Sequence, residues 1–429
     1  MSSRWPVVFG ALLASGLLAA QRSPEAKPAA ELRIGEVDSL SGVMAAQGTA
    51  VHEGIVYAVS EVNGAGGIHG HPVKLITRGD GGRPDEATTA ALELATRERV
   101  SALMGGYVDS VVGPVAQVAQ RERVPYVASS SLDQRLTQRG NQYFFRISRL
   151  DPFVNATTAV PLELWPAKEV AILFSSTPGA TQLARLQKER LEARGVRVSA
   201  FESFQTGTPD FIPLLARVKS RGTQLLLMDE FFADNLVLLR QIHGPTGPAL
   251  AVVGAFGMEF PALIKQLGPL GEGAMGAIAW EPGMSLSGDL EGSRAYEAGF
   301  ANRFDHPPAP LSMYGYTATR AVLAALEKAS DRSFAPEREA VRDALAKTDL
   351  KLPLEHLRFD EHGDPLHYEV GIFQIQKGTA RPSLSARQGY RKTGQAKAVI
   401  SFRPHRFCEL LLAERAVGLK LAARGVSAK

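Results

Sequence analysis

Short apolar runs alternate with amphipathic segments along most of the chain after residue 31, and this alternation predicts a parallel α/β fold. In one amphipathic segment, Val51, Ile55, Val59 and Val62 fall on the same face of a helix. The predicted strands of this first series are Leu32–Val37, Val73–Thr77, Ala102–Gly105 and Tyr126–Ala128. Its predicted helices are Thr49–Val62, Asp85–Arg97 and Val111–Arg121. Repeated strand–helix–strand units imply parallel strands with helices on both faces, so we expect a doubly wound lobe.

A second series of the same kind begins at Val170 and predicts a second lobe. Its predicted strands are Val170–Phe174, Val196–Phe201, Leu225–Met228 and Ala251–Val253. Its predicted helices are Ala180–Ala193, Leu214–Ser220 and Leu236–His243. One more helical pattern follows at Ser312–Ala329. The fold class we expect is therefore α/β, with two doubly wound, Rossmann-like lobes.

The N-terminal segment is typical of a secretory signal peptide. Arg4 precedes the apolar run Val7–Ala20, which ends in small residues, so we expect cleavage near Ala20 and a mature chain starting near Gln21. The run is shorter than the roughly 20 apolar residues of a membrane-spanning helix, which leaves an uncleaved anchor as the weaker alternative. Cys408 is the only cysteine, so we expect neither an N-terminal lipid anchor nor an internal disulfide.

Composition and charge fit an exported globular protein large enough for two lobes. The 429 residues are 45% hydrophobic and 21% charged, with a net charge of +4. The final fifty residues carry eleven Lys and Arg against two Glu, a net +9, so the rest of the chain is net −5. A basic tail can contact nucleic acid or membrane, but we interpret this one as a solvated extension without chemistry, and we expect no nucleic-acid partner.

An ordered set of turn motifs resembles one family of binding proteins. Its members along the chain are Ile34-Gly35, Leu40-Ser41-Gly42, Asn63–Gly70, Asp80, Met104-Gly105-Gly106, Val124–Val127 and Leu136–Gly140. Taken in this order they resemble the periplasmic solute-binding proteins of the branched-chain amino acid type, the Leu/Ile/Val-binding proteins of ABC transporters. The resemblance covers Leu32 to Gln376. It implies a type I periplasmic binding fold, in which the two lobes are joined by a three-crossing hinge and close on a ligand.

The resemblance also implies the domain limits. We place the crossings near Leu150, Trp280 and Leu350. The signal peptide is then residues 1–20 and the linker 21–30. Lobe I comprises 31–150 plus 281–350, lobe II comprises 151–280 plus 351–379, and the basic C-terminal extension is 380–429.

In the resembled family the first lobe clamps a ligand carboxylate. The clamp serine falls on Asp109 here, with Ser110 beside it, and the small or hydroxyl residues after the next strand fall on Ser129, Ser130 and Ser131. We prefer Ser110, because a hydroxyl and an N–H at a helix start bind an anion whereas a carboxylate repels one. Plain N-capping is the alternative role for these serines.

Two further residues are candidates for the first-lobe side of the ligand. Gln47 aligns with an aromatic residue that covers the ligand in the family, and Tyr107 lies on the loop beside the clamp. A packing or surface role is the alternative for each of them.

The second lobe departs from the family pattern. Phe256 stands where the family has a second-lobe acid that holds the ligand ammonium, and Leu132 of the first lobe replaces the threonine that shares this role, while Phe231 and Phe232 match the aromatic wall. A buried cation needs a paired charge, so we expect a ligand with a carboxylate or amide head, an apolar or aromatic body and no obligatory α-amino group. An acid nearby in sequence can replace the missing one. The alternatives are Asp229, Glu230 and Glu259.

The sequence carries no catalytic motif that would make the protein an enzyme, neither a G-x-S-x-G elbow nor a phosphate loop. His69 and His71 lie in a glycine turn, where we expect surface histidines rather than metal ligands, and we expect no cofactor. The function we expect is extracytoplasmic capture of a small molecule and delivery to an inner-membrane ABC permease by a periplasmic monomer. A ligand-sensing regulatory or receptor module of the same fold is the alternative.

Overall fold

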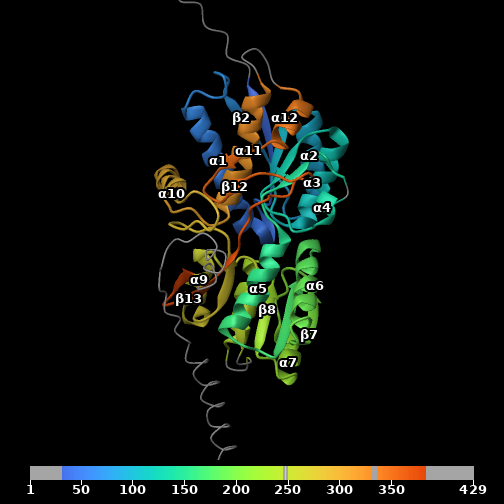
Figure 1. Cartoon of the computed structure of the whole chain (residues 1–429), viewed down its shortest axis with the longest axis vertical. Helices are drawn as coiled ribbons and strands as arrows, with labels where there is room; N and C mark the ends of the chain where they lie inside the picture. Colours follow the sequence, from blue (N-terminus) through green and yellow to red (C-terminus); the bar gives the residue numbers. More distant parts are fainter. Residues whose placement is uncertain (1–30, 139, 245–246, 248–249, 331–335, 383–429) are drawn as a thin grey trace, which may run out of the picture.

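The computed structural model describes residues 31–138, 140–244, 247, 250–330 and 336–382. They form two lobes, each built on its own β-sheet and stacked along the long axis of the molecule (Figure 1). The predicted signal peptide and linker, and all but the first three residues of the predicted basic extension, lie outside the described residues.

The first lobe contains a five-stranded parallel sheet in the order β2-β1-β3-β4-β5. Its strands are β1 (Leu32–Asp38), β2 (Val73–Gly79), β3 (Ala102–Gly105), β4 (Tyr126–Ala128) and β5 (Phe144–Arg146). Its helices are α1 (Ala45–Gly64), α2 (Pro84–Thr96), α3 (Asp109–Glu122), α4 (Arg135–Gln138), α11 (Ser312–Ala329) and α12 (Arg338–Leu345). Helices α1 and α11 touch backbone to backbone, because a Cβ at Gly54 would lie 1.8 Å from the Ser312 carbonyl oxygen.

The second lobe contains a seven-stranded sheet in the order β14-β13-β10-β9-β8-β6-β7. Its strands are β6 (Glu169–Ser175), β7 (Arg197–Phe204), β8 (Leu225–Asp229), β9 (Ala251–Gly254), β10 (Met275–Ile278), β13 (Gly371–Gln376) and β14 (Thr379–Pro382). Only β13 and β14 run antiparallel to their neighbours. Its helices are α5 (Leu150–Leu164), α6 (Pro178–Glu192), α7 (Ile212–Ser220), α8 (Phe232–Ile242) and α9 (Pro261–Leu267), with the 3-10 turn η2 (Gly268–Gly271).

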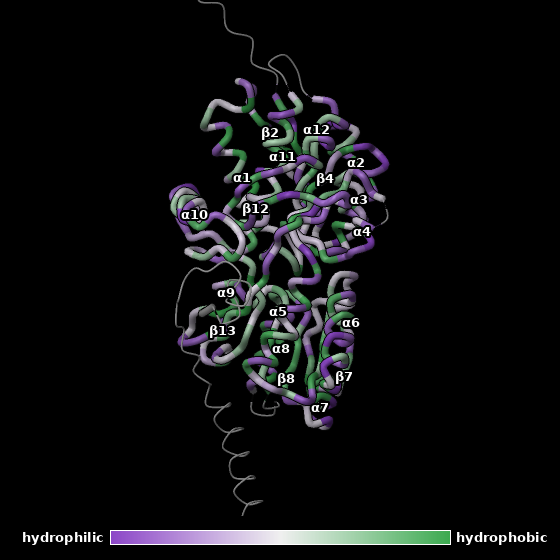
Figure 2. The backbone as a smooth tube through the Cα atoms, in the orientation of Figure 1, coloured by the Kyte–Doolittle hydropathy of each residue, from purple (hydrophilic) through white to green (hydrophobic). Residues whose placement is uncertain are grey.

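Three smaller elements complete the described chain. The 3-10 turn η1 (Gly42–Met44) precedes α1, and helix α10 (Leu290–Phe304) packs on the first lobe, where the Tyr296 and Tyr57 rings meet edge to face at 5.3 Å. The strands β11 (Leu350–Lys351) and β12 (His356–Leu357) form a short antiparallel ladder. Figure 2 shows hydrophobic residues concentrated on interior segments of both lobes, in line with the fully buried β8.

The chain passes between the lobes three times, after β5, after β10 and before β13, so the predicted α/β fold with a three-crossing hinge is confirmed. The third passage comes later than the sequence suggested, because the Arg146 N–H donates to the Gly363 carbonyl and holds that segment against β5. We propose moving this boundary from near Leu350 to a point after Gly363. The predicted extension begins at residue 380, yet residues 380–382 belong to β14.

Candidate ligand-binding site

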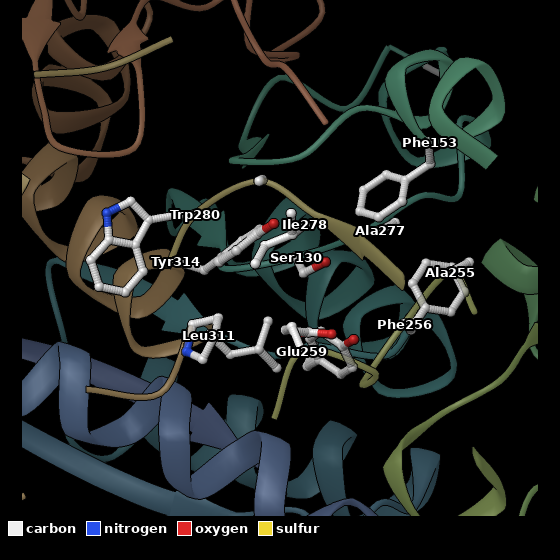
Figure 3. A pocket seen from close by; sticks show the side chains of 13 residues that line it. Ser130, Phe153, Ala255, Phe256, Glu259, Ala277, Ile278, Trp280, Leu311 and Tyr314 are labelled. Atoms are coloured by element: carbon white, nitrogen blue, oxygen red, sulfur yellow. The ribbon is translucent and has the colours of Figure 1, made fainter. Parts of the chain in front are cut away.

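A narrow cavity of about 20 Å³ lies between the two lobes (Figure 3). Residues of both lobes and of the second crossing line it. These are Tyr107, Ser130, Phe153, Ala255, Phe256, Glu259, Ala277, Ile278, Ala279, Trp280, Pro310, Leu311 and Tyr314. Five of them are aromatic and Glu259 carries the only ionisable carboxyl in the set.

Several of the loops that line this cavity follow the carboxyl ends of parallel strands. Tyr107 follows β3, Ser130 follows β4 and Phe256 follows β9, so each lies beyond the carboxyl end of its strand. Loops at the carboxyl ends of parallel strands are where doubly wound sheets bind their ligands. Trp280 follows β10 at the second crossing and Tyr314 lies in the first turn of α11, which closes the cavity on the hinge side.

Aromatic side chains from both lobes meet beside the cavity. The Tyr107 ring of the first lobe contacts the Phe231 ring of the second edge to face, with centroids 5.8 Å apart. Phe231 stacks on Phe256 at 5.6 Å, and Phe256 in turn contacts Phe153 at the same separation. These contacts give the cavity a largely apolar wall that suits an aromatic or aliphatic ligand body.

Glu259 is the polar exception in that wall. The residue is only 9% exposed, and its Oε2 atom has no hydrogen-bond partner within the described part of the chain. Burial raises the pKa of Glu259 to about 7, against the lowering effect of backbone hydrogen bonds from Glu259 itself and from Gly257. A buried carboxyl with a free oxygen beside a cavity is a candidate for pairing with a ligand donor.

Two tyrosines face Glu259 from the first lobe. Burial, followed by the charge of Glu259, holds the pKa of Tyr107 well above its usual range. Burial also raises the pKa of Tyr314, with a smaller contribution from Glu259. The Tyr314 hydroxyl shares a 2.7 Å hydrogen bond with the Tyr368 hydroxyl. Both tyrosines therefore stay neutral at ordinary pH and offer hydroxyls to the cavity.

The loop predicted to clamp a ligand carboxylate holds Asp109 instead. The Asp109 carboxylate accepts hydrogen bonds from Ser131 Oγ at 2.5 Å, from the Leu132 N–H at 3.2 Å and from the Asp133 N–H at 3.1 Å. It also faces the second lobe, since a Cβ at Gly179 would lie 1.9 Å from Asp109 Oδ2. Only glycine fits at the start of α6 at this separation.

A second link joins the lobes next to Asp109. Gln182 of α6 donates through Nε2 to Asp133 Oδ1 at 2.6 Å, and its Oε1 accepts from the Gln134 N–H at 3.1 Å. One side chain of the second lobe thus bonds both members of a first-lobe turn, which stabilises this relative placement of the lobes.

The structure brings three of the nine predicted site residues to the cavity, namely Tyr107, Ser130 and Phe256. Phe231 stands behind Phe256, and Phe232 packs on the Phe260 ring. Ser131 and Leu132 hold Asp109, as described above. A ligand contact by any of the nine remains a prediction.

Ser110 and Gln47 lie elsewhere. Ser110 lines a separate hollow and lies within α3, whose N-cap is Val108, without a side-chain cap, while the Ser131 hydroxyl donates to Asp109. Gln47 is fully buried in α1, and its amide atoms have no partner within the described residues. Neither residue belongs to the cavity wall.

Four residues that were not among the predicted site residues also line the cavity, namely Phe153, Trp280, Leu311 and Tyr314. The sequence placed Trp280 at a predicted crossing and Tyr314 within the predicted helix Ser312–Ala329, and these positions were the signals available. Of the three alternative acids, Glu259 lines the cavity. Asp229 does not line it, and its carboxylate accepts a 3.0 Å hydrogen bond from Gln187.

Two further features of the described residues concern metal binding and membrane insertion. No cluster of three or more His, Cys, Asp or Glu side chains in this part of the chain is arranged to hold a metal ion. Within the same residues, no helix combines the length and apolar character that a membrane crossing requires.

Comparison with known proteins identifies the family. The model of the family described as "Periplasmic binding protein" matches residues 31–380, and the chain belongs to this family. The leucine-, isoleucine-, valine-, threonine- and alanine-binding protein of Pseudomonas aeruginosa is 22% identical over 354 residues, 82% of this chain and 92% of that protein.

Solved structures of two binding proteins share the fold. The leucine-binding protein LivK of Thermotoga maritima superposes with a TM-score of 0.74 and 23% identity, over 82% of this chain and 98% of that one. A solute-binding protein of an ABC transporter from R. palustris, in complex with benzoate, gives a TM-score of 0.72 and 16% identity, over 82% and 95%. The predicted resemblance to the Leu/Ile/Val-binding proteins is thereby confirmed.

Proposed function

We propose that the protein is an exported solute-binding protein that captures a small molecule in the cavity between its lobes and delivers it to an ABC permease. The observation that carries this proposal is the cavity itself, which both lobes and the hinge line at the carboxyl ends of parallel strands. Closure of two lobes around a ligand is a conformational signal that a membrane partner can recognise.

The lining supports a ligand with an apolar or aromatic body and one polar head. The aromatic wall formed by Phe153, Phe256 and Trp280 suits the body, and Ser130, Glu259 and the tyrosine hydroxyls suit the head. Structural relatives in complex with isoleucine and with benzoate show that the fold accommodates both kinds of body. The carboxylate or amide head expected from the sequence, and the amino head that Glu259 allows, are the classes to compare.

A thermal-shift screen tests the capture function. The purified protein, unfolded and refolded to remove carried-over ligand, is heated with leucine, isoleucine, benzoate, short amides and the corresponding amines. A ligand present at about 100 times its dissociation constant adds roughly 2.7 kcal/mol to the free energy of unfolding. We expect at least one of these compounds to raise the melting temperature.

A matched pair of variants assigns the shift to the cavity. Ala277→Leu fills part of the cavity wall, whereas Ala193→Leu adds the same atoms at an exposed position after α6. We expect the ligand-induced shift to shrink in the first variant and to persist in the second. Equal shifts in both variants would place binding elsewhere, and no shift with any compound class would contradict the proposal.

A further inference from the structure

We propose that the cavity selects solutes that carry an amine and lack a carboxylate, with Glu259 pairing with the ligand ammonium and Asp109 occupying the donors that would hold a ligand carboxylate. This inference rests on the proposed function and specifies the ligand class of the same cavity.

The hydrogen-bond donors in the loop after β4 are already occupied by Asp109. Here Ser131 Oγ and the N–H groups of Leu132 and Asp133 all donate to the Asp109 carboxylate. A second carboxylate brought to this loop would find these donors already occupied by Asp109, which disfavours binding.

Arg146 is a buried cation whose guanidinium already has partners. Arg146 is 1% exposed, and its guanidinium donates to Asp364 Oδ1 at 2.6 Å and to the carbonyls of Ser131 and Asp133 at 3.2 and 3.1 Å. Arg146 therefore holds the loop after β4 through its carbonyl groups and is already paired with Asp364. The cavity lining itself contains no Lys, Arg or His. A ligand carboxylate would have no positive partner there.

In place of a cation, the cavity wall contains a carboxyl group, hydroxyl groups and aromatic rings. Glu259 Oε2 lacks a partner among the described residues and borders the cavity with Tyr314 and Ser130 nearby (Figure 3). Five aromatic rings line the same space, and ring faces attract a desolvated cation. One free carboxylate oxygen, hydroxyl acceptors and aromatic faces together match a protonated amine on an apolar body.

Binding calorimetry on compounds with shared bodies tests this inference. One set is 3-methylbutylamine, 4-methylpentanoate and leucine, and the other is benzylamine and benzoate. We expect each amine to bind at least tenfold more tightly than its matched acid, and 3-methylbutylamine to bind more tightly than leucine. An acid or leucine binding as tightly as the matched amine would overturn the inference and leave the capture function intact. No binding by any compound would overturn both.

Two variants test the residues that carry the argument. Glu259→Gln keeps the size of the side chain and removes its charge, so amine affinity should fall at least tenfold, while Glu291→Gln on α10 should leave it unchanged. Asp109→Ser frees the loop donors, so leucine affinity should rise at least tenfold. If Asp109→Ser does not fold, the Glu259 result decides alone. Unchanged amine affinity in Glu259→Gln would contradict the inference.

Discussion

At the scale of single residues, the polarity of the site depends on the positions of two carboxyl groups, those of Asp109 and Glu259. Sequence reasoning preferred Ser110 over Asp109, because a carboxylate repels an anionic ligand. The structure shows Asp109 satisfied by three donors of its own lobe, so the expected carboxylate clamp is filled by a side chain. Glu259 is left as the one carboxyl of the cavity wall, and its unpaired oxygen determines what kind of head group is favoured.

The pKa of Glu259, raised by burial to about 7, predicts how amine binding depends on pH. The ionised form pairs with an ammonium, so the protein must lose a proton on binding below pH 7. Amine affinity should therefore fall about tenfold for each pH unit below 7 and level off above it. Tyr107 and Tyr314, which face Glu259, stay neutral throughout because their pKa values are raised. Calorimetry between pH 5.5 and 8.5 measures the profile.

The Glu259→Gln variant is the control for that profile, since it should bind weakly with no dependence on pH over this range. An opposite profile, with affinity rising toward acid pH, would mean that protonated Glu259 donates to a ligand anion.

At the scale of elements, strand β8 brings acidic groups into the core of the second lobe. Its last residue, Asp229, is fully buried and accepts a hydrogen bond from Gln187 of α6, and burial raises its pKa to about 8. The next residue, Glu230, is also fully buried, and both its carboxyl oxygens lack partners in the described chain. Burial, with the nearby charges of Asp229 and Asp234, raises the pKa of Glu230 well above its usual value. Burial thus favours the protonated form of both acids in the folded lobe.

These raised pKa values predict a loss of stability toward alkaline pH. The unfolded chain releases the Asp229 proton near pH 3.8, whereas the folded lobe keeps it to about pH 8. The free energy of unfolding should thus fall as pH rises between these values, by at most about 1.4 kcal/mol per pH unit for this group. Denaturant titrations at pH 5, 6.5 and 8 measure the slope.

The variant Asp229→Asn isolates the contribution of that carboxyl, because an amide keeps the acceptor for Gln187 and cannot ionise. Its stability should depend less steeply on pH than that of the parent protein. Asp85→Asn, at an exposed position in the first turn of α2, serves as the control and should retain the parent slope. Parallel slopes in all three proteins would refute the assignment.

At the scale of the whole molecule, a polar side chain, an aromatic pair and a close approach at a glycine join the two lobes. Gln182 of α6 bonds the Asp133–Gln134 turn of the first lobe, and Tyr107 contacts Phe231 across the cleft. Close approach at Gly179 allows α6 to reach Asp109. The Tyr107–Phe231 contact lies at the cavity wall, so placement of the lobes and enclosure of a ligand are coupled.

Removing the Gln182 side chain should weaken the enclosed arrangement. Each lost hydrogen bond contributes about 0.5–1.5 kcal/mol, so ligand affinity in Gln182→Ala should fall several-fold or more. Small-angle scattering of the ligand-saturated variant should give a larger radius of gyration than the parent complex. Gln266→Ala on the exposed side of α9 is the matched control and should change neither quantity. Parent-like affinity and size in Gln182→Ala would show that this link is dispensable.

Local patterns anticipated most elements of the fold. The strands Ala102–Gly105 and Tyr126–Ala128 and the helix Ser312–Ala329 have the predicted bounds, and the other predicted elements are present within a few residues. Helix α5 was not predicted, because Pro152 and Pro161 interrupt its pattern and its apolar residues are interspersed with threonines. Its stability comes from packing on α6 and on the strands of the second sheet, which sequence periodicity does not reveal.

The sequence by itself determined the two doubly wound lobes, their glycine turns and the family, because strand and helix periodicities and close backbone approaches depend on local residue order. Tertiary structure decided the contents of the cavity. Glu259 and Phe256 are three residues apart and both line it, whereas Trp280 and Tyr314 reach it only because the chain crosses between lobes. It also decided that Asp109, rather than a ligand, takes the donors of Ser131 and Leu132, since that depends on distances between residues more than twenty positions apart.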